Sequence, residues 1–526
     1  MQFTADVLIV GSGPTGLTLA TILKRHGVSV KIIEKRQRLT TTTKATNLMQ
    51  GCQEKLAIYD MVKPMLERAG KLSRMWMYCY DKNIIGLNYV REKSPFKTVL
   101  LLGQNNIEAP LGNFLNETGI NINFETELIH LNQNENSVSV TTKSPKGEFH
   151  ENFKYVVGCD GARSVTKTFT KLDFTPINTK VTVRQIDAVL KWKRLNSMKQ
   201  MWLFYYDTGF CAVIPLLDNT TKFITFDSSE TTPNRKPTLE EMQIKLREVC
   251  KDDTATLENP IWFSQSELLT GLAPGLVDNR VILAGDAGNP ILPNGGQGLN
   301  TGIQDSINLG WKLADTILYK GSAKLLLSYN EERLSLRAGL EKAQNISLKY
   351  VIKPPKLMKW IVKKFGPFLV KKGEDAMIQA FSQLSVGYPQ SPLTVEKLKR
   401  GIVKAGDSIR DADILYAKTN QEVSLFAILS FPKWKLVYFD HGTGIDPRNE
   451  FDEIEKEYPF LKTLLISSSL KTIQQVSNLY YDIDELAHKA YGILQPTIYC
   501  VRPDNYVGLR TNNLKDVSSY IQELFH

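Results

Sequence analysis

Residues 6–34 read DVLIVGSGPTGLTLATILKRHGVSVKIIE. A short apolar run, Asp6–Val10, is followed by glycines in the spacing G-x-G-x-x-G, by a segment of helical character, and by a second apolar run that ends at Glu34. This order predicts a strand, a glycine turn, a helix and a second, parallel strand. Such a βαβ unit is the start of a dinucleotide-binding domain, and it predicts an α/β fold.

Each part of the glycine turn has a physical task. The first glycine permits the tight turn, the second lets the backbone approach a pyrophosphate, and the third lets helix and strand pack closely. The helix then offers free N–H groups and its positive dipole end to the phosphates. The predicted phosphate-binding residues are Gly11, Gly13, Pro14, Thr15 and Gly16.

An acidic residue ends the second predicted strand. A carboxylate at Glu34 can accept both hydroxyls of a ribose, which suits an adenosine without a 2′-phosphate. The site therefore fits FAD or NAD and argues against NADP.

Two later motifs, each after an apolar strand, favour FAD over NAD. They are 158–164 (GCDGARS) and 285–289 (GDAGN), the second continuing as 293–300 (PNGGQGLN). Asp286, at a strand end, can bind a ribityl hydroxyl. The glycine-rich run lets backbone N–H groups approach a flat ring, and the helix that follows points its positive end at the negative charge of a reduced flavin.

Together these motifs resemble the FAD-dependent aromatic hydroxylases, the single-component flavoprotein monooxygenases typified by p-hydroxybenzoate hydroxylase and phenol hydroxylase. The resemblance runs from residue 2 to about 340. It places Lys44 where the family often has an Arg that follows the mobile flavin, and Gln104 at the ribityl chain. It places Arg36 near the adenosine. It implies further FAD contacts by Lys35, Asp160, Gly161, Arg163, Gly285, Asp286, Pro293, Gly296, Gln297, Gly298, Leu299 and Asn300.

The resemblance also implies a reaction. In the family NAD(P)H reduces FAD, O2 adds to the flavin as a C4a-hydroperoxide, and OH is transferred to an electron-rich ring; the substrate class implied is a phenolic or polyketide-like aromatic. Two positions depart from the family pattern, since Asn289 stands where many members have His and Gly51 where many have Arg. The loop residues expected at the reacting flavin ring are Pro293, Gly295 and Gly296.

Strand-rich sequence between about 178 and 268 predicts an antiparallel substrate-binding sheet inserted in the nucleotide domain. Alternate side chains of its strands are expected to face a pocket, although a place in the sheet core is as good an expectation for each. Phe210 and Ala212 replace both tryptophans of the halogenase motif W-x-W-x-I-P, which argues against halogenation. The substrate-lining candidates are Trp202, Phe204, Tyr205, Phe210 and Ile214.

The region beyond about 400 alternates short strands and helices. Residues 501–507 (VRPDNYV) are similar to the R-P-D-G-Y-V signature in the thioredoxin-like tail of phenol hydroxylase relatives. The tail has no C-x-x-C pair, so a structural role is expected. The domains predicted are 1–177 (FAD-binding, first part), 178–268 (substrate sheet), 269–395 (FAD-binding completion and helices) and 396–526 (thioredoxin-like).

Composition bounds the remaining expectations. The chain has 526 residues and a net charge of +10, spread without an Arg-rich block or nucleic-acid motif, so no nucleic-acid partner is expected. No apolar run approaches the roughly 18 residues that span a bilayer, and no stable membrane insertion is expected. The six cysteines fit neither a disulfide framework nor a metal site, which predicts reduced thiols in a cytoplasmic protein.

Residues 347–373 are basic and amphipathic and can touch a membrane surface. Pro354, Pro355 and Pro367 are expected to break this segment into short pieces, which favours a helix packed on the body with its lysines in water.

Two alternatives to hydroxylation stay open. The same fold can perform a Baeyer–Villiger or antibiotic-inactivating oxidation, and a protein of another class can hold FAD and a ligand without turnover. NADH against NADPH stays open, and a homodimer is expected only from the family.

Overall fold

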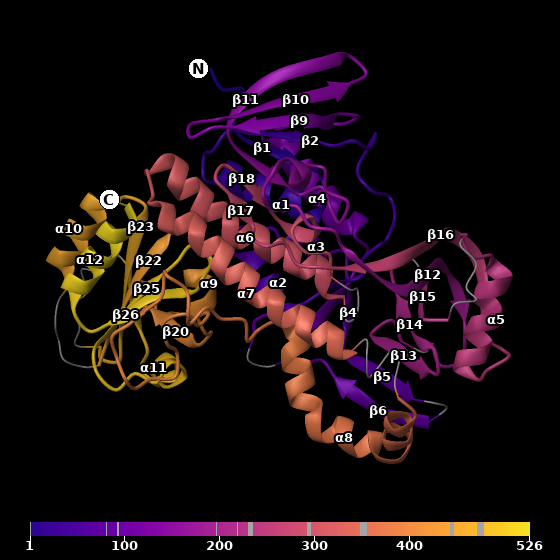
Figure 1. Cartoon of the computed structure of the whole chain (residues 1–526). Helices are drawn as coiled ribbons and strands as arrows, with labels where there is room; N and C mark the ends of the chain where they lie inside the picture. Colours follow the sequence, from indigo (N-terminus) through magenta and orange to yellow (C-terminus); the bar gives the residue numbers. More distant parts are fainter. Residues whose placement is uncertain are drawn as a thin grey trace.

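The computed structural model describes residues 2–79, 82–91, 94–195, 197–217, 219–229, 235–291, 296–347, 355–441, 447–470 and 478–525. Figure 1 shows a central body, a second sheet beside it, and a C-terminal body on the other side. Among the described residues, no helix is long and apolar enough to cross a membrane.

The central body is built on a doubly wound sheet. Five parallel strands lie in the order β8–β2–β1–β11–β18, which by chain position is 3-2-1-4-5. The chain reverses its winding between β1 and β11, so ligands are expected at the carboxyl ends of these two strands. The strands are β1 (Ala5–Val10), β2 (Val30–Ile33), β8 (Ile122–Asn123), β11 (Gly147–Gly158) and β18 (Val281–Leu283), with β9 (Glu127–Gln133), β10 (Val138–Ser144) and β17 (Val277–Asp278) added antiparallel.

Helices cover this sheet. The helix that follows β1 and the long helix that contains Gly310 cross in close contact, since a Cβ on Gly310 would lie 2.5 Å from the Ile22 side chain. A small sheet and two short helices lie beneath them. The elements are α1 (Pro14–Arg25), α2 (Gln50–Ala57), α3 (Lys63–Leu66), α4 (Asn105–Glu117) and α6 (Gln297–Leu318), with β3 (Asn47–Leu48), β4 (Gly70–Leu72) and β7 (Val99–Leu101).

The second sheet has seven strands in the order β16–β12–β15–β14–β13–β5–β6. The predicted range 178–268 holds most of five strands, but two others come from residues 74–88, far earlier in the chain. α5 (Leu239–Cys250) packs on one face of the sheet. The strands are β5 (Arg74–Cys79), β6 (Lys82–Asn88), β12 (Ile177–Lys191), β13 (Gln200–Tyr206), β14 (Gly209–Pro215), β15 (Thr220–Asp227) and β16 (Thr256–Thr270).

Two long helices follow. α7 (Ala323–Ser347) packs along α6, and α8 (Lys356–Ser382) arcs under β5 and β6 (Figure 1). The expected break at Pro367 is wrong, because α8 is one helix of 27 residues that continues past this position. Pro355 is the N-cap at which α8 begins, and Pro354 lies outside the described residues. α8 is visibly curved in Figure 1.

The C-terminal body has the topology of a thioredoxin-like domain. β23 pairs parallel with β22, which pairs antiparallel with β25, and β25 pairs antiparallel with β26. The elements are β19 (Val395–Glu396), β20 (Asp413–Tyr416), β21 (Gln421–Ser424), β22 (Trp434–Asp440), β23 (Leu461–Ser467), β24 (Leu479–Tyr481), β25 (Thr497–Val501) and β26 (Val507–Thr511), with α9 (Leu425–Leu429), α10 (Arg448–Glu457), α11 (Leu486–Tyr491) and α12 (Leu514–Phe525).

Candidate active site

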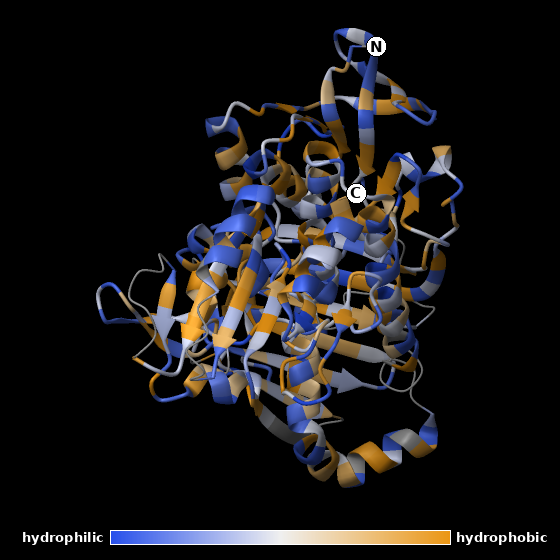
Figure 2. Ribbon diagram, turned by 90° about the vertical axis from the view of Figure 1, so that its left-hand side faces the viewer, coloured by the Kyte–Doolittle hydropathy of each residue, from blue (hydrophilic) through white to orange (hydrophobic). Residues whose placement is uncertain are grey.

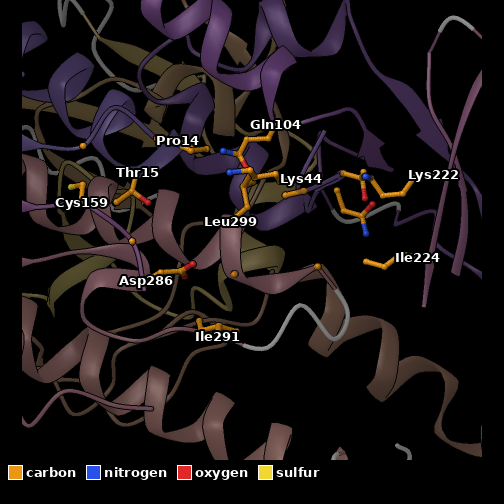
Figure 3. Close-up of a pocket in the computed structure, with 18 of the residues that line it drawn as sticks. Pro14, Thr15, Lys44, Gln104, Cys159, Lys222, Ile224, Asp286, Ile291 and Leu299 are labelled. Atoms are coloured by element: carbon orange, nitrogen blue, oxygen red, sulfur yellow. The ribbon is translucent and has the colours of Figure 1, made fainter. Parts of the chain in front are cut away.

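One cavity of about 610 Å³ joins the first sheet to the second. Figure 3 shows Pro14, Thr15 and Asp286 toward one end and Lys222 and Ile224 toward the other. The first end lies at the carboxyl ends of β1 and β11, where the winding reverses. The site therefore combines a nucleotide-binding crevice with a chamber on the second sheet.

The loop that follows β1 and the loop that follows β11 touch each other at Gly11. Gly11 has φ +105°, a conformation that favours glycine, and a Cβ there would lie 2.6 Å from the carbonyl oxygen of Cys159. Gly16 meets Gly11 just as closely, since its Cβ would lie 2.0 Å from the Gly11 carbonyl oxygen. These close approaches are possible because both residues lack a side chain, and no side chain fits at either position.

Gly13 is different, because no atom lies within 4 Å of the place where its Cβ would be. It is the N-cap of α1, and no side chain caps the helix. The free N–H groups of the first turn thus lie beside the cavity, which Gly13, Pro14 and Thr15 all line.

Glu34 lies at the end of β2, buried, beside the same crevice. It accepts hydrogen bonds from the backbone N–H and hydroxyl of Ser12, both at 2.9 Å, and from the backbone and guanidinium of Arg36 at 3.0 and 2.9 Å. Burial raises the pKa of Glu34, but the bonds from Arg36 and Ser12 outweigh burial and lower this pKa to about 2. The carboxylate is therefore ionised and is an acceptor at physiological pH.

Asp160 follows β11 and also lines the cavity. Its Oδ2 accepts three hydrogen bonds, from the backbone N–H of Val165 and from the backbone and hydroxyl of Thr166, at 2.8–3.0 Å. Its Oδ1 is buried and has no hydrogen-bond partner within the described ranges. Gly161, with φ +82°, leaves open space where a Cβ would be. The Asp160 carboxylate is thus held by one oxygen, and its other oxygen is a buried acceptor without a partner among the described residues.

Asp286 lies deep in the protein, and its side chain is exposed to the cavity. Burial raises the pKa of Asp286 from 3.8 to about 6, against the attraction of Arg337. The turn that carries it is braced from behind by Asp305, which accepts a bond of 2.9 Å from the Gly285 N–H and one of 2.7 Å from Arg333, and which pairs with Arg337. Sequence reasoning missed both arginines, which lie on α7 and have no local motif.

We expect Asp286→Asn to stabilise the ligand-free protein. In the unfolded chain Asp286 ionises near its ordinary pKa of 3.8, and in the folded protein only near 6. Folding is therefore weakened as pH rises from about 4 to about 6, and the weakening persists above that pH. The variant should melt about 1–3 °C higher at pH 8 and equally with wild type near pH 4.

Thermal melting of FAD-free protein across this pH range is the measurement. A gain in melting temperature that is equal at pH 4 and pH 8 would show that charge burial is not the cause.

α6 begins at Gly296, whose φ of +70° is left-handed, and it has no side-chain cap. Gly296, Gly298 and Leu299 line the cavity. Asn300 does not: it accepts a bond of 2.8 Å from the Met49 N–H and donates to the Gly296 carbonyl at 2.9 Å, so it braces the turn. Pro293 and Gly295, predicted at the reacting ring, lie outside the described residues.

Other predicted cofactor residues also lie at the cavity. Gln104 donates to Glu108 at 2.7 Å, and Glu108 is a buried carboxylate that the sequence prediction did not include. The predicted cofactor residues that line the cavity are Gly11, Gly13, Pro14, Thr15, Glu34, Lys35, Arg36, Lys44, Gln104, Asp160, Gly161, Arg163, Asp286, Gly296, Gly298 and Leu299. Those that do not line it are Gly16, Gly285, Gln297 and Asn300.

The second sheet presents one face to the cavity and the other to α5. Tyr205, Phe210 and Ile214 line the cavity. Trp202 and Phe204 do not; they lie in the core beneath α5, so the expectation that they contact substrate is corrected. Successive side chains of a strand point to opposite faces of the sheet. Trp202 and Phe204 lie an odd number of positions from Tyr205 on the same strand, so they face away from the cavity.

An aromatic wall, formed by Tyr205, Phe210 and Phe226, crosses three neighbouring strands on the cavity side. Phe210 and Phe226 stack with ring centroids 4.3 Å apart, and Tyr205 lies 5.7 Å from Phe210. Met75, Met201, Leu203, Ala212, Ile224 and Phe381 complete an apolar lining. Phe381 belongs to α8, and no sequence pattern linked it to this site.

One charged residue, Lys222, lies at the chamber end of the cavity. Its Nζ is 2.8 Å from Oδ1 of Asp187 on the neighbouring strand, and both side chains are buried. Asp187 also accepts a hydrogen bond from the Thr43 hydroxyl. The pair thus connects the segment next to Lys44 with the second sheet. The alternation of Lys222, Ile224 and Phe226 is a period-2 signal that could have identified them.

Comparison with known proteins agrees with this geometry. A family model described as FAD binding domain matches residues 4–343. An uncharacterized aromatic compound monooxygenase of Bacillus subtilis is 30% identical over 345 residues, 65% of this chain and 67% of that protein. Pentachlorophenol 4-monooxygenase of Sphingobium chlorophenolicum is 25% identical over 529 residues, 96% of this chain and 94% of that protein.

Among solved structures, the flavin-dependent monooxygenase PieE, in complex with FAD and substrate, superposes with a TM-score of 0.79 at 18% identity. The match covers 99% of this chain and 98% of that one, so the likeness in fold includes the C-terminal body.

Proposed function

The chain belongs to the family of flavoproteins that share this FAD-binding domain, and on that premise we propose that it uses NAD(P)H and O2 to hydroxylate a phenolic or polyketide-like aromatic compound. The observation that carries the proposal is the continuity of the cavity. The nucleotide crevice and the aromatic wall line one space, so a flat ring bound against the wall lies in the same water-poor chamber as the cofactor.

The residues of the crevice fit FAD. The open space beside Gly13 and the uncapped start of α1 suit a pyrophosphate. Glu34 offers an ionised acceptor to the adenosine ribose, and the free Oδ1 of Asp160 together with Asp286 offers acceptors to further hydroxyls. When bound, FAD supplies the redox chemistry, taking electrons from NAD(P)H and activating O2.

The chain's own residues bind and orient the substrate and keep water out of the chamber. The apolar lining keeps the chamber dry, and the aromatic wall gives a flat surface for a ring. Burial raises the pKa of Tyr205 well above its usual range, so its hydroxyl stays protonated at physiological pH. That hydroxyl has no hydrogen-bond partner in the described part of the chain and is free to bond a substrate oxygen.

The test is a panel of phenols and polyketide-like aromatics added to the yellow, FAD-loaded protein. The expected result is that one class accelerates NAD(P)H oxidation and that its product gains one oxygen. Product structure separates ring hydroxylation from Baeyer–Villiger insertion. FAD binding without NAD(P)H consumption by any aromatic would instead identify a binding protein.

We expect Tyr205→Phe to lower kcat/KM for the accepted phenol roughly ten-fold, the size of one lost hydrogen bond in a dry site. FAD affinity should not change, because Tyr205 lies at the chamber end of the cavity. Tyr206→Phe is the matched control: Tyr206 packs on the opposite core and donates to the Phe226 carbonyl at 3.2 Å. Equal losses in both variants would assign the effect to packing.

The remaining assignments follow the same proposal. We propose that the thioredoxin-like domain is structural, that the enzyme works in the cytoplasm, and that it forms a homodimer without nucleic acid. Sedimentation velocity of the FAD-loaded protein tests the dimer directly.

A further inference from the structure

The first half of α8 exposes an unusual set of side chains. Large apolar side chains there are exposed to solvent, whereas the sequence favours a helix that packs on the body. Their exposed fractions are 69% for Leu357, 54% for Trp360, 44% for Phe365, 67% for Phe368 and 48% for Leu369. Figure 2 shows this helix at the lower end of the molecule with hydrophobic and hydrophilic residues side by side.

These residues form one surface and alternate with lysines. Trp360, Lys364 and Phe368 follow each other at intervals of four, which places them on one helix face. Phe365 and Leu369 form the neighbouring row, and the Lys364 ammonium lies 5.1 Å from the Trp360 ring centroid and 5.5 Å from that of Phe365. We define the α8 face as Leu357, Trp360, Lys364, Phe365, Phe368 and Leu369.

The charge of the segment selects a partner. Residues 356–373 (KLMKWIVKKFGPFLVKKG) contain six lysines and no acidic residue. A two-fold dimer through this face would set the lysines of one copy against those of the other, because an isologous interface pairs a patch with itself. An anionic lipid surface has the opposite charge and accepts aromatic side chains at its boundary.

The other side of α8 is anchored to the body and leads to the active site. Met377 and Ile378 pack on the cavity-side core of the second sheet, and Phe381 lines the cavity itself. Lys359 pairs with Asp207 at 3.0 Å, which ties the exposed half to the same sheet. The exposed face is therefore held at a defined place next to the substrate chamber.

We propose that the α8 face is a docking surface for an anionic lipid bilayer. The apolar side chains lie at the headgroup boundary, the lysines contact the lipid phosphates, and the helix lies in the plane of the membrane. This position brings the chamber close to a phase in which apolar aromatic compounds dissolve. The proposal does not depend on which aromatic compound the enzyme accepts.

Vesicle sedimentation of the full-length, FAD-loaded protein tests this. The probes are vesicles of phosphatidylcholine alone and of equal parts phosphatidylcholine and phosphatidylglycerol. We expect binding to the anionic vesicles, none to the neutral ones, and weaker binding at high salt. Lys364→Glu/Lys372→Glu and Trp360→Ser/Phe368→Ser should each lower the apparent partition coefficient at least about ten-fold.

Matched controls lie elsewhere on the surface. Lys418→Glu, on the C-terminal body, changes the net charge without touching α8, and Ile261→Ser removes an apolar side chain that is 69% exposed on β16. Both should bind vesicles like wild type, and the FAD absorbance of every variant reports its fold. Two results would overturn the proposal directly: no sedimentation of wild type with anionic vesicles, or an equal loss of vesicle binding in the control variants. A dimer that Phe368→Ser dissociates, in a protein that does not bind vesicles, would instead identify a second copy of the chain as the occupant of the α8 face.

Discussion

Gly13→Asp is expected to abolish FAD binding and leave the ligand-free protein as stable as before. Gly13 has ordinary helix N-cap angles, φ −74° and ψ −179°, and open space at the Cβ position. Asp is a better N-cap than Gly by a few tenths of a kcal/mol, so the fold does not suffer. The new carboxylate, however, occupies the place that suits a pyrophosphate, and like-charge juxtaposition costs several kcal/mol, which is at least about 100-fold in FAD affinity.

Flavin fluorescence quenching on titration of ligand-free protein gives the affinity, and urea unfolding gives the stability. Gly13→Asn is the matched control, since it has the same size and cap preference without the charge; its loss should be clearly smaller. Gly16→Ala should behave in the opposite way and destabilise the fold itself, because its Cβ would lie 2.0 Å from the Gly11 carbonyl oxygen. Unchanged FAD affinity in Gly13→Asp would show that no phosphate lies at the start of α1.

Arg502→Met is expected to destabilise the protein by about 3–5 kcal/mol, the usual result of breaking a buried ion pair from one side. Arg502 is fully buried at the contact between the C-terminal body and the central body. Its guanidinium bonds both carboxylate oxygens of Glu332 on α7, at 2.6 and 3.0 Å, and both of Asp504, at 3.0 and 2.6 Å. Met occupies a similar volume, but it leaves the buried carboxylates of Glu332 and Asp504 without the guanidinium that binds them.

Urea unfolding compares this variant with Lys489→Met, which removes a largely exposed lysine 3.8 Å from Glu485 on the same body. Exposed pairs contribute about 0–1 kcal/mol, so the control should barely move the midpoint. Arg502→Lys keeps the charge but loses the bidentate hydrogen bonds, so its unfolding midpoint should lie between those of Arg502→Met and Lys489→Met. An unfolding midpoint of Arg502→Met equal to that of Lys489→Met would mean that the R-P-D segment does not hold the two bodies together.

The buried cluster around Arg502 gives the tail motif a packing role. The motif at 501–507 provides the arginine and the aspartate of a buried network that also includes Lys312, 2.8 Å from Glu332. Cys500, in the preceding strand, is buried, and burial raises the pKa of its thiol to about 12. These contacts support the proposal that the thioredoxin-like domain is structural.

The second sheet shows where pattern reasoning stops. The apolar content of the sequence predicts its strands, but it does not predict which side of each strand faces the cavity. Both faces of this sheet are covered, one by α5 and one by the cavity wall and α8. A strand with one wet face shows alternating polarity, whereas here Trp202 and Phe204 are as apolar as the residues that line the cavity.

Long-range pairing was equally hidden. β5 joins β13 in parallel although about 120 residues separate them, so no local turn announces the contact. The two arginines on α7 that brace Asp305 depend on the same kind of contact, since nothing near Arg333 or Arg337 in the sequence marks them as site residues.

The sequence alone predicts the glycine turn, the acidic residue at the end of β2, the later aspartates and, from their order, an FAD site made of three distant stretches of chain. These features could be read because each depends on local backbone geometry or on the fixed direction of a parallel strand. The folded chain was needed to show which aromatic residues line the chamber, which charges are buried, and that α8 turns its apolar side outward. Those outcomes depend on what each face packs against, and a contact between residues far apart in the chain leaves no periodic signal in either one.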